Sequence, residues 1–442
     1  MQSPQLFNVE LPAEVTRQAV ETVSWQRLAD QPLQDNTNIR VEIRSDQTYR
    51  QWEGFGGAVS ELGWQALAAL DKTQREPFFQ RLFGADGAGF NWIRLPVGAS
   101  DFARDEYSFS ETPEDYELAH FTIERDRQAL IPFIQAAKSA NPDLRIHASP
   151  WSPPGWMKHS GAMAGQENSE LRDEPRVLTA YALYLRKFIE AYADEGIHID
   201  RLMVQNEMDS QAPFPGCRWT PELFVRFHLD YLKPEFERHG IQTEIWAGTF
   251  RTMTGLQAHD CFANSAFRKS VAGAAFQYSF PDALTDLQLL YPGTRIMHTE
   301  SACHSGRNTT AEAVGQFDDV IAYAQAGASV FTYWNMVLDQ NRTSTWGWPQ
   351  NSLCTVNTET GQLVFNPDFE IFQLLGKAIR PGAMRIRAFS YLARTACFRN
   401  PDGSFVLLLR NLEGPRQAEI TLDGATQTVE LPGHAVCCVR LR

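Results

Sequence analysis

Two glutamates close short apolar runs in this sequence, and their side chains are the best placed to do chemistry. Glu207 ends the segment Val204-Gln205-Asn206-Glu207, and Glu300 ends the segment His298-Thr299-Glu300. Cleavage of a glycosidic bond needs two carboxyl groups, one that protonates the leaving oxygen and one that attacks or activates water. A single glutamate at a strand end is more often an ion-pair partner, so the interpretation depends on the pair and its neighbours.

The other apolar runs also end in polar or aromatic residues. A guanidinium beside an ionised carboxylate keeps the pKa of that carboxylate low. Tryptophan rings suit a sugar, because the C–H face of a pyranose packs on an aromatic ring while its hydroxyl groups reach polar side chains. The residues at or just beyond these ends are Arg94, Asp101, Trp151, Gln277, Tyr278 and Trp334, with Trp346 in the segment that follows.

The elements that must hold these residues repeat along the chain. Between residues 52 and 336, short apolar runs alternate with longer segments of helical periodicity, which is typical of βα units around a parallel sheet. Eight runs predict a closed (β/α)₈ barrel, in which the C-terminal strand ends gather at one mouth. The predicted strands are 52–59, 90–97, 144–151, 201–207, 243–250, 271–278, 295–300 and 329–336.

The segment 174–195 illustrates the predicted helices. Its apolar residues, from Val177 to Tyr192, recur at three- and four-residue spacing on one face, and Gly196 supplies a helix end. Asn141-Pro142-Asp143 ends the helix before the third strand in the same way. The alternation of strand and helix is therefore consistent along the barrel.

The flanks of the barrel follow a different pattern. Residues 39–44 and the stretch 384–442 alternate apolar and polar residues at period two, with turn signals at Asn400-Pro401-Asp402-Gly403 and Asp423-Gly424. This pattern predicts an antiparallel β sandwich that is discontinuous in sequence. We expect residues 1–50 and 381–442 to form the sandwich and residues 51–380 to form the catalytic barrel.

Composition limits the classes of protein and partner. The 442 residues are 43% hydrophobic and 21% charged, which is typical of a folded globular protein and excludes disordered and coiled-coil classes. The formal net charge of −13 argues against a nucleic-acid partner and against an anionic membrane surface. The seven cysteines contain no C-x-x-C pair, so they predict buried thiols rather than a disulfide framework or a metal site.

The start of the chain bears on location. The sequence has no apolar stretch of 18 residues, and Met1-Gln2-Ser3-Pro4-Gln5 has neither the basic nor the apolar region of a signal peptide. As given, the chain is expected to be cytoplasmic. It would be secreted or periplasmic if a signal peptide has been removed.

Six segments, in order along the chain, carry a resemblance to a known family. They are Trp52-Glu53-Gly54-Phe55-Gly56-Gly57-Ala58, Arg94-Leu95-Pro96-Val97-Gly98, residues 148–158 (ASPWSPPGWMK), Val204-Gln205-Asn206-Glu207, Thr299-Glu300 and Tyr333-Trp334-Asn335. In them the chain resembles glycoside hydrolase family 30, the family of glucosylceramidase and its bacterial relatives. The resemblance extends to Ile379-Arg380-Pro381-Gly382-Ala383 and implies a retaining mechanism and a terminal sandwich.

The resemblance also implies roles for individual residues. Glu207 matches the acid/base of the family and Glu300 matches its nucleophile, with Arg94 as the arginine that contacts the nucleophile. The positions that match sugar contacts are Asn206 at the 2-hydroxyl group, Asp101 and Trp151 at the far hydroxyl groups, and Trp334 lining the pocket.

Three departures from the family pattern border the expected pocket. Met208 stands where most of the family has proline, and the sixth strand ends in Phe276-Gln277-Tyr278-Ser279, where His-Trp-Tyr or His-x-Tyr is common. The segment after Trp334 reads Thr345-Trp346-Gly347-Trp348 rather than a glycine-rich turn. Gln277, Tyr278 and Trp346 are therefore predicted substrate-binding residues, and the departures argue against transferring ceramide specificity.

These observations predict a retaining β-glycosidase that needs no metal and no cofactor. Trp346 and Trp348 would wall off one end of the site, so an exo-acting β-glucosidase is favoured, with β-fucosides or β-xylosides as further substrates. The alternatives are an endo-β-glycanase acting on β-1,6-glucan or xylan, and a sugar-binding protein without turnover. The presence of both glutamates argues against the binding protein, which has no need for two poised carboxyl groups.

Overall fold

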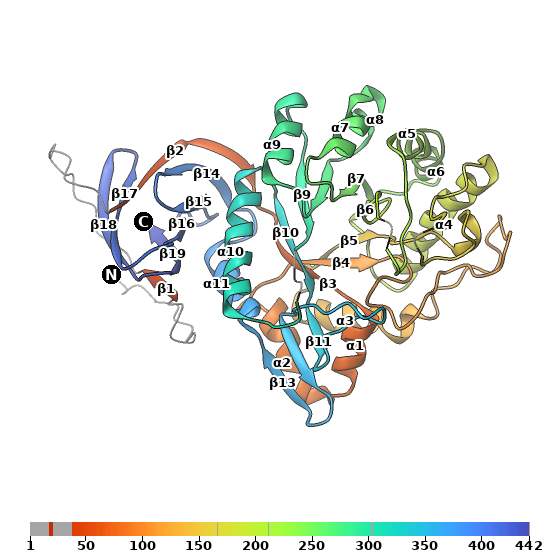
Figure 1. The fold of residues 1–442 in the computed structure, drawn as a ribbon, viewed down its shortest axis with the longest axis horizontal. Helices are drawn as coiled ribbons and strands as arrows, with labels where there is room; N and C mark the ends of the chain where they lie inside the picture. The colour runs from red at the N-terminus through yellow and green to blue at the C-terminus, as the bar shows by residue number, and fades with distance from the viewer. Residues whose placement is uncertain are drawn as a thin grey trace.

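A barrel and an all-β domain lie side by side in the structure, a computed structural model that describes residues 17–20, 38–165, 167–210, 212–301, 303 and 305–441 (Figure 1). Of the predicted N-terminal part of the sandwich, residues 1–16 and 21–37 lie outside the described residues. The barrel occupies the right of Figure 1 and the β domain the left.

Eight parallel strands form the barrel sheet, in the order β10-β3-β4-β5-β6-β7-β8-β9. The ring closes where the amide of Ser329, just before β10, donates to the carbonyl of Ile296 in β9 at 3.0 Å. The predicted (β/α)₈ barrel is confirmed. Its strands are β3 (Gly54–Ala58), β4 (Trp92–Pro96), β5 (Arg145–Ser149), β6 (Arg201–Met203), β7 (Glu244–Phe250), β8 (Ala274–Gln277), β9 (Ile296–Glu300) and β10 (Val330–Asn335).

The fourth strand is shorter than predicted. It ends at Met203, so the predicted extension to Glu207 is wrong. Glu207 has a φ of 48°, in the left-handed region, and cannot continue an extended strand. The preceding Asn206 instead turns its amide to the carbonyl oxygen of Pro150 at 2.7 Å. The Asn206–Glu207 pair therefore sits in a turn above the barrel rather than within its wall.

Helices surround the barrel, and α4 (Pro175–Asp194) shows why they form. Proline occupies its first turn, where no intrahelical donor is lost, and its apolar face is buried from Val177 to Tyr192 as predicted. The other helices are α1 (Glu61–Ala68), α2 (Lys72–Phe83), α3 (Leu130–Ala140), α5 (Pro221–Arg226), α6 (Lys233–Arg238), α7 (Leu256–Ala263), α8 (Ser265–Ser270), α9 (Pro281–Leu290), α10 (Thr310–Gln325) and α11 (Pro367–Ala378). There are also two short 3₁₀ helices, η1 (Asp126–Gln128) and η2 (Gly155–Met157), and a π-helical segment, η3 (Phe227–Leu232).

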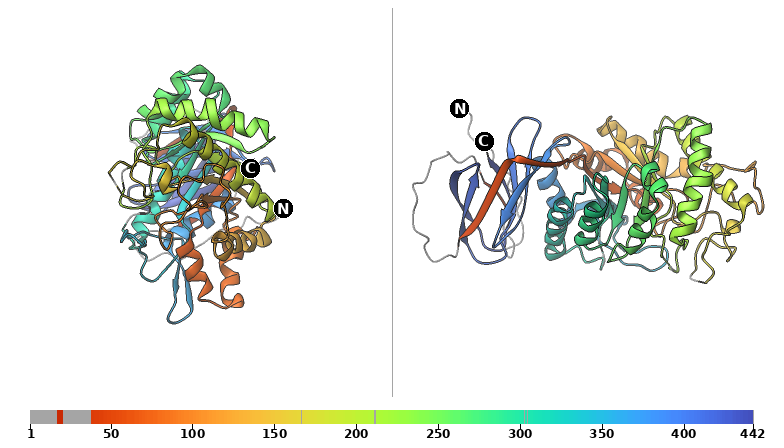
Figure 2. Two further views of the ribbon diagram at one scale, coloured as in Figure 1. Left: turned by 90° about the vertical axis from the view of Figure 1, so that its right-hand side faces the viewer. Right: turned by 90° about the horizontal axis from the view of Figure 1, so that it is seen from above.

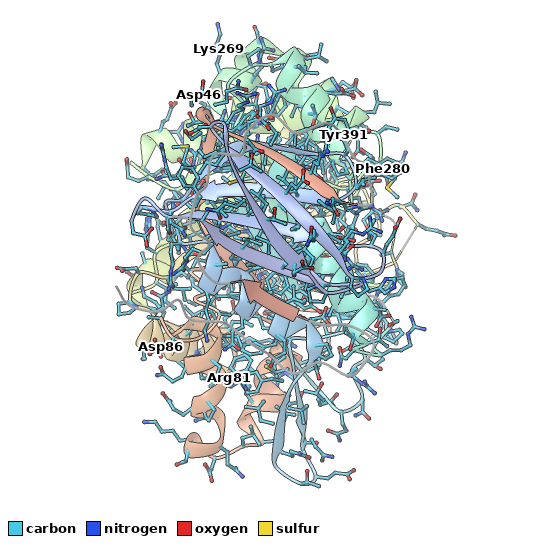
Figure 3. All side chains as sticks on the ribbon, turned by 90° about the vertical axis from the view of Figure 1, so that its left-hand side faces the viewer. Asp46, Arg81, Asp86, Lys269, Phe280 and Tyr391 are labelled. Carbon is cyan, nitrogen blue, oxygen red and sulfur yellow. The ribbon has the colours of Figure 1, made fainter. Side chains whose placement is uncertain are left out.

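A second sheet forms the β domain, with its strands in the order β1-β19-β16-β15-β14-β2-β17-β18. Apolar side chains from both halves of this sheet, such as Ile420 and Leu407, belong to one buried cluster. The strands are β1 (Arg17–Val20), β2 (Ile39–Gln51), β14 (Met384–Ser390), β15 (Arg394–Arg399), β16 (Phe405–Arg410), β17 (Arg416–Leu422), β18 (Ala425–Leu431) and β19 (Val436–Leu441). Figure 3 views this domain from its outer side.

Two pairings in this sheet differ from the antiparallel arrangement that the alternation predicts. β1 pairs with β19 and β17 pairs with β2, both in parallel. Parallel strands need a long crossover connection, and the whole barrel separates β2 from β17 in sequence. The discontinuity of the domain therefore permits pairings that hairpins alone would not give.

The barrel and the β domain share an apolar boundary at α10 and α11, which lie between them in Figures 1 and 2. The ring of Trp52 packs edge-on against Phe398 of β15 at 5.7 Å between centroids, and the Gln325 amide donates to the carbonyl of Thr395 at 2.6 Å. A small sheet of β11 (Val337–Asp339), β12 (Cys354–Asn357) and β13 (Gln362–Phe365) extends from the barrel after β10.

The cysteines are buried free thiols, as predicted. Within the part of the chain that the structure describes, none of the helices combines the length and the apolar character needed to cross a bilayer.

Candidate active site

A cavity of about 1060 Å³ opens at the C-terminal ends of the barrel strands. It brings together predicted residues that lie far apart in the sequence, from the loop after β4 to the end of β9. Those that line it are Asp101, Trp151, Asn206, Glu207, Tyr278 and Glu300. The structure thus gathers six of the ten predicted site residues on the cavity wall, and the other four, Arg94, Gln277, Trp334 and Trp346, are described below.

Glu300 ends β9 and is held by donors on two sides. Arg94 of β4, which is fully buried, forms an ion pair with Glu300 Oε2, and the Tyr278 hydroxyl donates to Oε1. Arg94 also donates to the side-chain oxygen of Asn206 at 2.5 Å. These contacts fix the orientation of the Glu300 carboxylate, and the guanidinium compensates its buried charge.

Glu207 faces Glu300 from the turn that follows β6 and is equally buried. Its side chain is only 9% exposed, and its main-chain amide donates to Thr249 Oγ1 at 3.0 Å. Burial and the nearby charge of Glu300 raise the pKa of Glu207 to about 7, while Arg251 and Gln277 act in the opposite direction. A substantial fraction of Glu207 is therefore protonated at neutral pH, as a general acid requires.

Gln277, at the end of β8, bridges the two glutamates from beneath the cavity surface. Its amide nitrogen lies 3.1 Å from Glu207 Oε1 and 3.2 Å from Glu300 Oε2. These two oxygens can be no further apart than the sum of the two distances, which is below the ~6.5–9.5 Å separation of inverting enzymes. The Gln277 side-chain oxygen accepts from Thr299 Oγ1 at 3.1 Å, which aims the amide nitrogen at the carboxyl groups.

Two tryptophans and Asp101 form the wall beside Glu300. The rings of Trp151 and Trp334 stack at 5.1 Å between centroids, with Trp151 on the cavity surface and Trp334, which is 1% exposed, behind it. Burial and the charges of Glu300 and Glu207 raise the pKa of Asp101 well above its usual value. Asp101 lines the cavity, and among the described residues its buried Oδ1 has no hydrogen-bond partner, which marks it as a candidate contact for a ligand hydroxyl group.

The second tryptophan of the segment 345–350, rather than the first, reaches the cavity. Trp346 does not line it, whereas Trp348 does, and its ring meets Phe214 edge-on at 6.4 Å between centroids. Trp348, and not Trp346, is therefore the tryptophan of this segment that contributes to the cavity wall.

Sequence reasoning missed several residues on the cavity opening. Arg251 follows β7 directly, so its place at a barrel strand end was the signal that could have revealed it. Phe280, which is 56% exposed, and Met253 have no comparable signal, because exposed apolar residues are common. The other lining residues not predicted include Asp209, Phe214 and His298.

A (β/α)₈ barrel with two glutamates facing each other at its C-terminal mouth, beside aromatic rings and an unpartnered carboxyl oxygen, defines the class of glycoside hydrolases. The sequence model of the Glycosyl hydrolase family 30 TIM-barrel domain matches residues 52–352. The chain belongs to glycoside hydrolase family 30, and the family supports a retaining glycosidase.

Individual proteins are similar over most of their length. Putative glucosylceramidase 3 of Caenorhabditis elegans is 27% identical over 89% of this chain and 78% of its own. An endo-1,6-β-D-glucanase of Aspergillus fumigatus is 25% identical over 82% of this chain and 78% of its own. The crystal structure of SrfJ from Salmonella typhimurium superimposes with a TM-score of 0.86 at 24% identity, covering 94% of both chains.

Proposed function

We propose that Glu300 is the nucleophile and Glu207 the acid/base of a retaining β-glycosidase. In the first step the Glu300 carboxylate attacks the anomeric carbon, the bond to the leaving oxygen breaks, and Glu207 gives that oxygen a proton. In the second step Glu207 takes a proton from water, the water oxygen attacks the anomeric carbon, and Glu300 leaves. The roles proposed below for the other site residues follow from their positions around Glu207 and Glu300.

The observation that carries this proposal is the bridge made by Gln277. It supports a short separation between the two carboxyl groups, as a covalent route requires. The different surroundings of the two glutamates support the division of roles, since Arg94 and Tyr278 stabilise charge on Glu300 while burial raises the pKa of Glu207 to about 7.

The glycon is proposed to lie against Trp151, with its hydroxyl groups at Asp101 and Asn206. Trp334 supports Trp151 from behind, and Gln277 and Tyr278 hold the carboxyl groups rather than the sugar. No contact supports the sugar-binding role expected of Trp346. These positions suit a single sugar ring between Trp151 and Glu300.

We propose that the enzyme is exo-acting on β-glucosides, with β-fucosides or β-xylosides as further substrates. Phe214 follows the fourth barrel strand and Trp348 follows the eighth, so their contact spans opposite sides of the mouth. Segments after strands five to seven supply much of the lining, including the loop residues Arg251 and Tyr278 and, in α10, Asp319. An aromatic bridge of this kind supports a blind glycon pocket that opens toward those loops.

A panel of aryl β-D-glycosides tests the proposal, with the glucoside, fucoside, xyloside, galactoside and glucuronide assayed beside Glu300→Ala as a blank. We expect turnover of the glucoside that disappears in the variant. Turnover of another member alone would change the proposed glycon, and silence on every member would contradict exo action.

A second candidate is an endo-β-glycanase of the β-1,6-glucanase or xylanase type. It is favoured by the Aspergillus fumigatus relative, whose name is that of an endo-1,6-β-D-glucanase. Product length from a reduced β-1,6-linked gluco-oligosaccharide separates the candidates. Release of single sugars from the non-reducing end supports exo action, whereas internal cleavage into shorter oligosaccharides supports the endo-enzyme.

A further inference from the structure

One arginine at the cavity opening joins Glu207 to a second carboxylate. Arg251 is the first residue after β7, and its side chain is 40% exposed. Its Nε lies 3.1 Å from Asp209 Oδ1 and 3.5 Å from Glu207 Oε2. Asp209 stands two residues beyond Glu207 on the same turn, so the guanidinium spans both carboxyl groups of this turn.

The two oxygens of Glu207 therefore have different neighbours. Oε1 faces the Gln277 amide nitrogen and Oε2 faces Arg251. The end of β7 fixes the residue twice, because Thr249 accepts from the Glu207 amide at 3.0 Å and Arg251 follows two residues later. The end of β7, which is not part of the Glu207 turn, thus contacts both the main chain and the carboxyl group of Glu207.

The charge of Arg251 lowers the pKa of Glu207, against burial and the nearby anions, which raise it. A cation near a carboxyl group favours its ionised form, whereas burial and nearby anions favour the protonated form. The charged or titratable groups that face Glu207 from the surrounding strands and loops are Arg94, Asp101, Asp209, Arg251, Tyr278 and Glu300. Arg94 is committed to Glu300 and Asn206, so Arg251 is the cation that reaches the Glu207 carboxyl group within the described residues.

We propose that Arg251, held by Asp209, is a positioning residue that orients the Glu207 carboxyl group and sets the pH at which it exchanges its proton. The inference rests on the proposed role of Glu207 as acid/base. Arg251 Nε lies closer to Asp209 Oδ1 than to Glu207 Oε2, so Asp209 limits how closely the guanidinium approaches Glu207. The two charges act on the pKa of Glu207 in opposite directions, because Arg251 lowers it and Asp209 raises it.

The roles of Arg251 and Asp209 are tested by the pH dependence of kcat/KM on an alkyl β-glucoside. Two variants are expected to shift this dependence in opposite directions. Arg251→Met removes the cation, so the alkaline limb should move up by about one pH unit. Asp209→Asn removes the anion, so the limb should move down. A merely structural disturbance would lower activity in both variants without moving the limbs in opposite directions.

Two further variants control the experiment. Arg251→Lys keeps the charge and should return the limb toward that of the unmodified enzyme. Arg226→Met removes an arginine of similar exposure, 46%, that pairs with Asp173 on the surface, and should leave the profile unchanged. Limbs of Arg251→Met and Asp209→Asn that coincide with the parent limb would overturn the proposal.

A titration without substrate separates this inference from the proposed function. The carboxyl ¹³C resonance of Glu207, assigned by its absence from Glu207→Gln, reports proton exchange even if no glycoside is turned over. The same opposite shifts of its midpoint in Arg251→Met and Asp209→Asn support the role of Arg251. Equal midpoints in both folded variants would contradict it, whatever the outcome of the activity assays.

Discussion

The side-chain amide nitrogen of Gln277 lies 3.1 Å from Oε1 of Glu207, and both residues are buried. The same nitrogen lies 3.2 Å from Glu300 Oε2, so one neutral donor serves two carboxyl groups of opposite proposed roles. A cation at this point would lower the pKa of Glu207 and oppose its work as an acid. An amide holds both groups while leaving Glu207 able to keep its proton.

Removing this donor should weaken catalysis without unfolding the barrel. Gln277→Leu keeps the volume but leaves both carboxyl groups without the amide, and hydrogen bonds to charged groups contribute roughly 1.5–3 kcal/mol. We expect kcat/KM on an aryl β-glucoside to fall about 10- to 100-fold. The exposed Gln242→Leu is the control and should be unaffected. Unchanged kcat/KM in Gln277→Leu would show that the bridge has no part in catalysis.

The pKa of Glu207 predicts the alkaline limb of the pH profile. The acid must be protonated in the first step, and its pKa is raised to about 7, so kcat/KM on an alkyl glucoside should fall as the pH rises through about 7. Activated leaving groups depart without the proton, so Glu207→Ala should lose this limb on a dinitrophenyl glucoside. A limb that persists unchanged in Glu207→Ala belongs to another group.

Two glycines on neighbouring helices predict opposite effects of the same substitution. A Cβ at Gly376 in α11 would collide with the carbonyl oxygen of Ala88, whereas a Cβ at Gly315 in α10 meets nothing within 4 Å. Gly376→Ala should therefore destabilise the protein by about 2 kcal/mol, through backbone crowding. Gly315→Ala should stabilise it by roughly 0.5–1 kcal/mol, because alanine favours the helix.

Thermal unfolding of the two variants checks this pair. The expected order of Tm is Gly315→Ala, then the parent, then Gly376→Ala. An equal or higher Tm for Gly376→Ala would mean that α11 does not approach the chain at Ala88 as closely as the structure has it.

The barrel could be predicted from sequence because its signal repeats. Each buried parallel strand, such as Trp92–Pro96, is a short apolar run, and each covering helix, such as Pro175–Asp194, shows the 3.6-residue period. The end of the fourth strand could not be placed, because the left-handed φ of Glu207 has no signature in a non-glycine residue. The parallel pairing of β2 with β17 was also hidden, since it depends on the insertion of the barrel between them.

The cavity was predictable where residues end strands and not where loops fold over the mouth. Arg94 lies within β4 and Glu300 ends β9, and the barrel brings them together whatever the loops do. The contact of Phe214 with Trp348 joins two loops of irregular conformation, whose meeting no periodicity encodes. For the same reason, the sequence does not show that Trp348, rather than Trp346, lines the cavity.

Azide rescue tests the roles of Glu300 and Glu207 most directly. With a dinitrophenyl β-glucoside, azide should restore turnover of Glu300→Ala and give the α-glucosyl azide, because the anion attacks from the side that the nucleophile left open. In Glu207→Ala it should give the β-glucosyl azide, through the covalent intermediate. The α product from Glu207→Ala, or the β product from Glu300→Ala, would contradict the account.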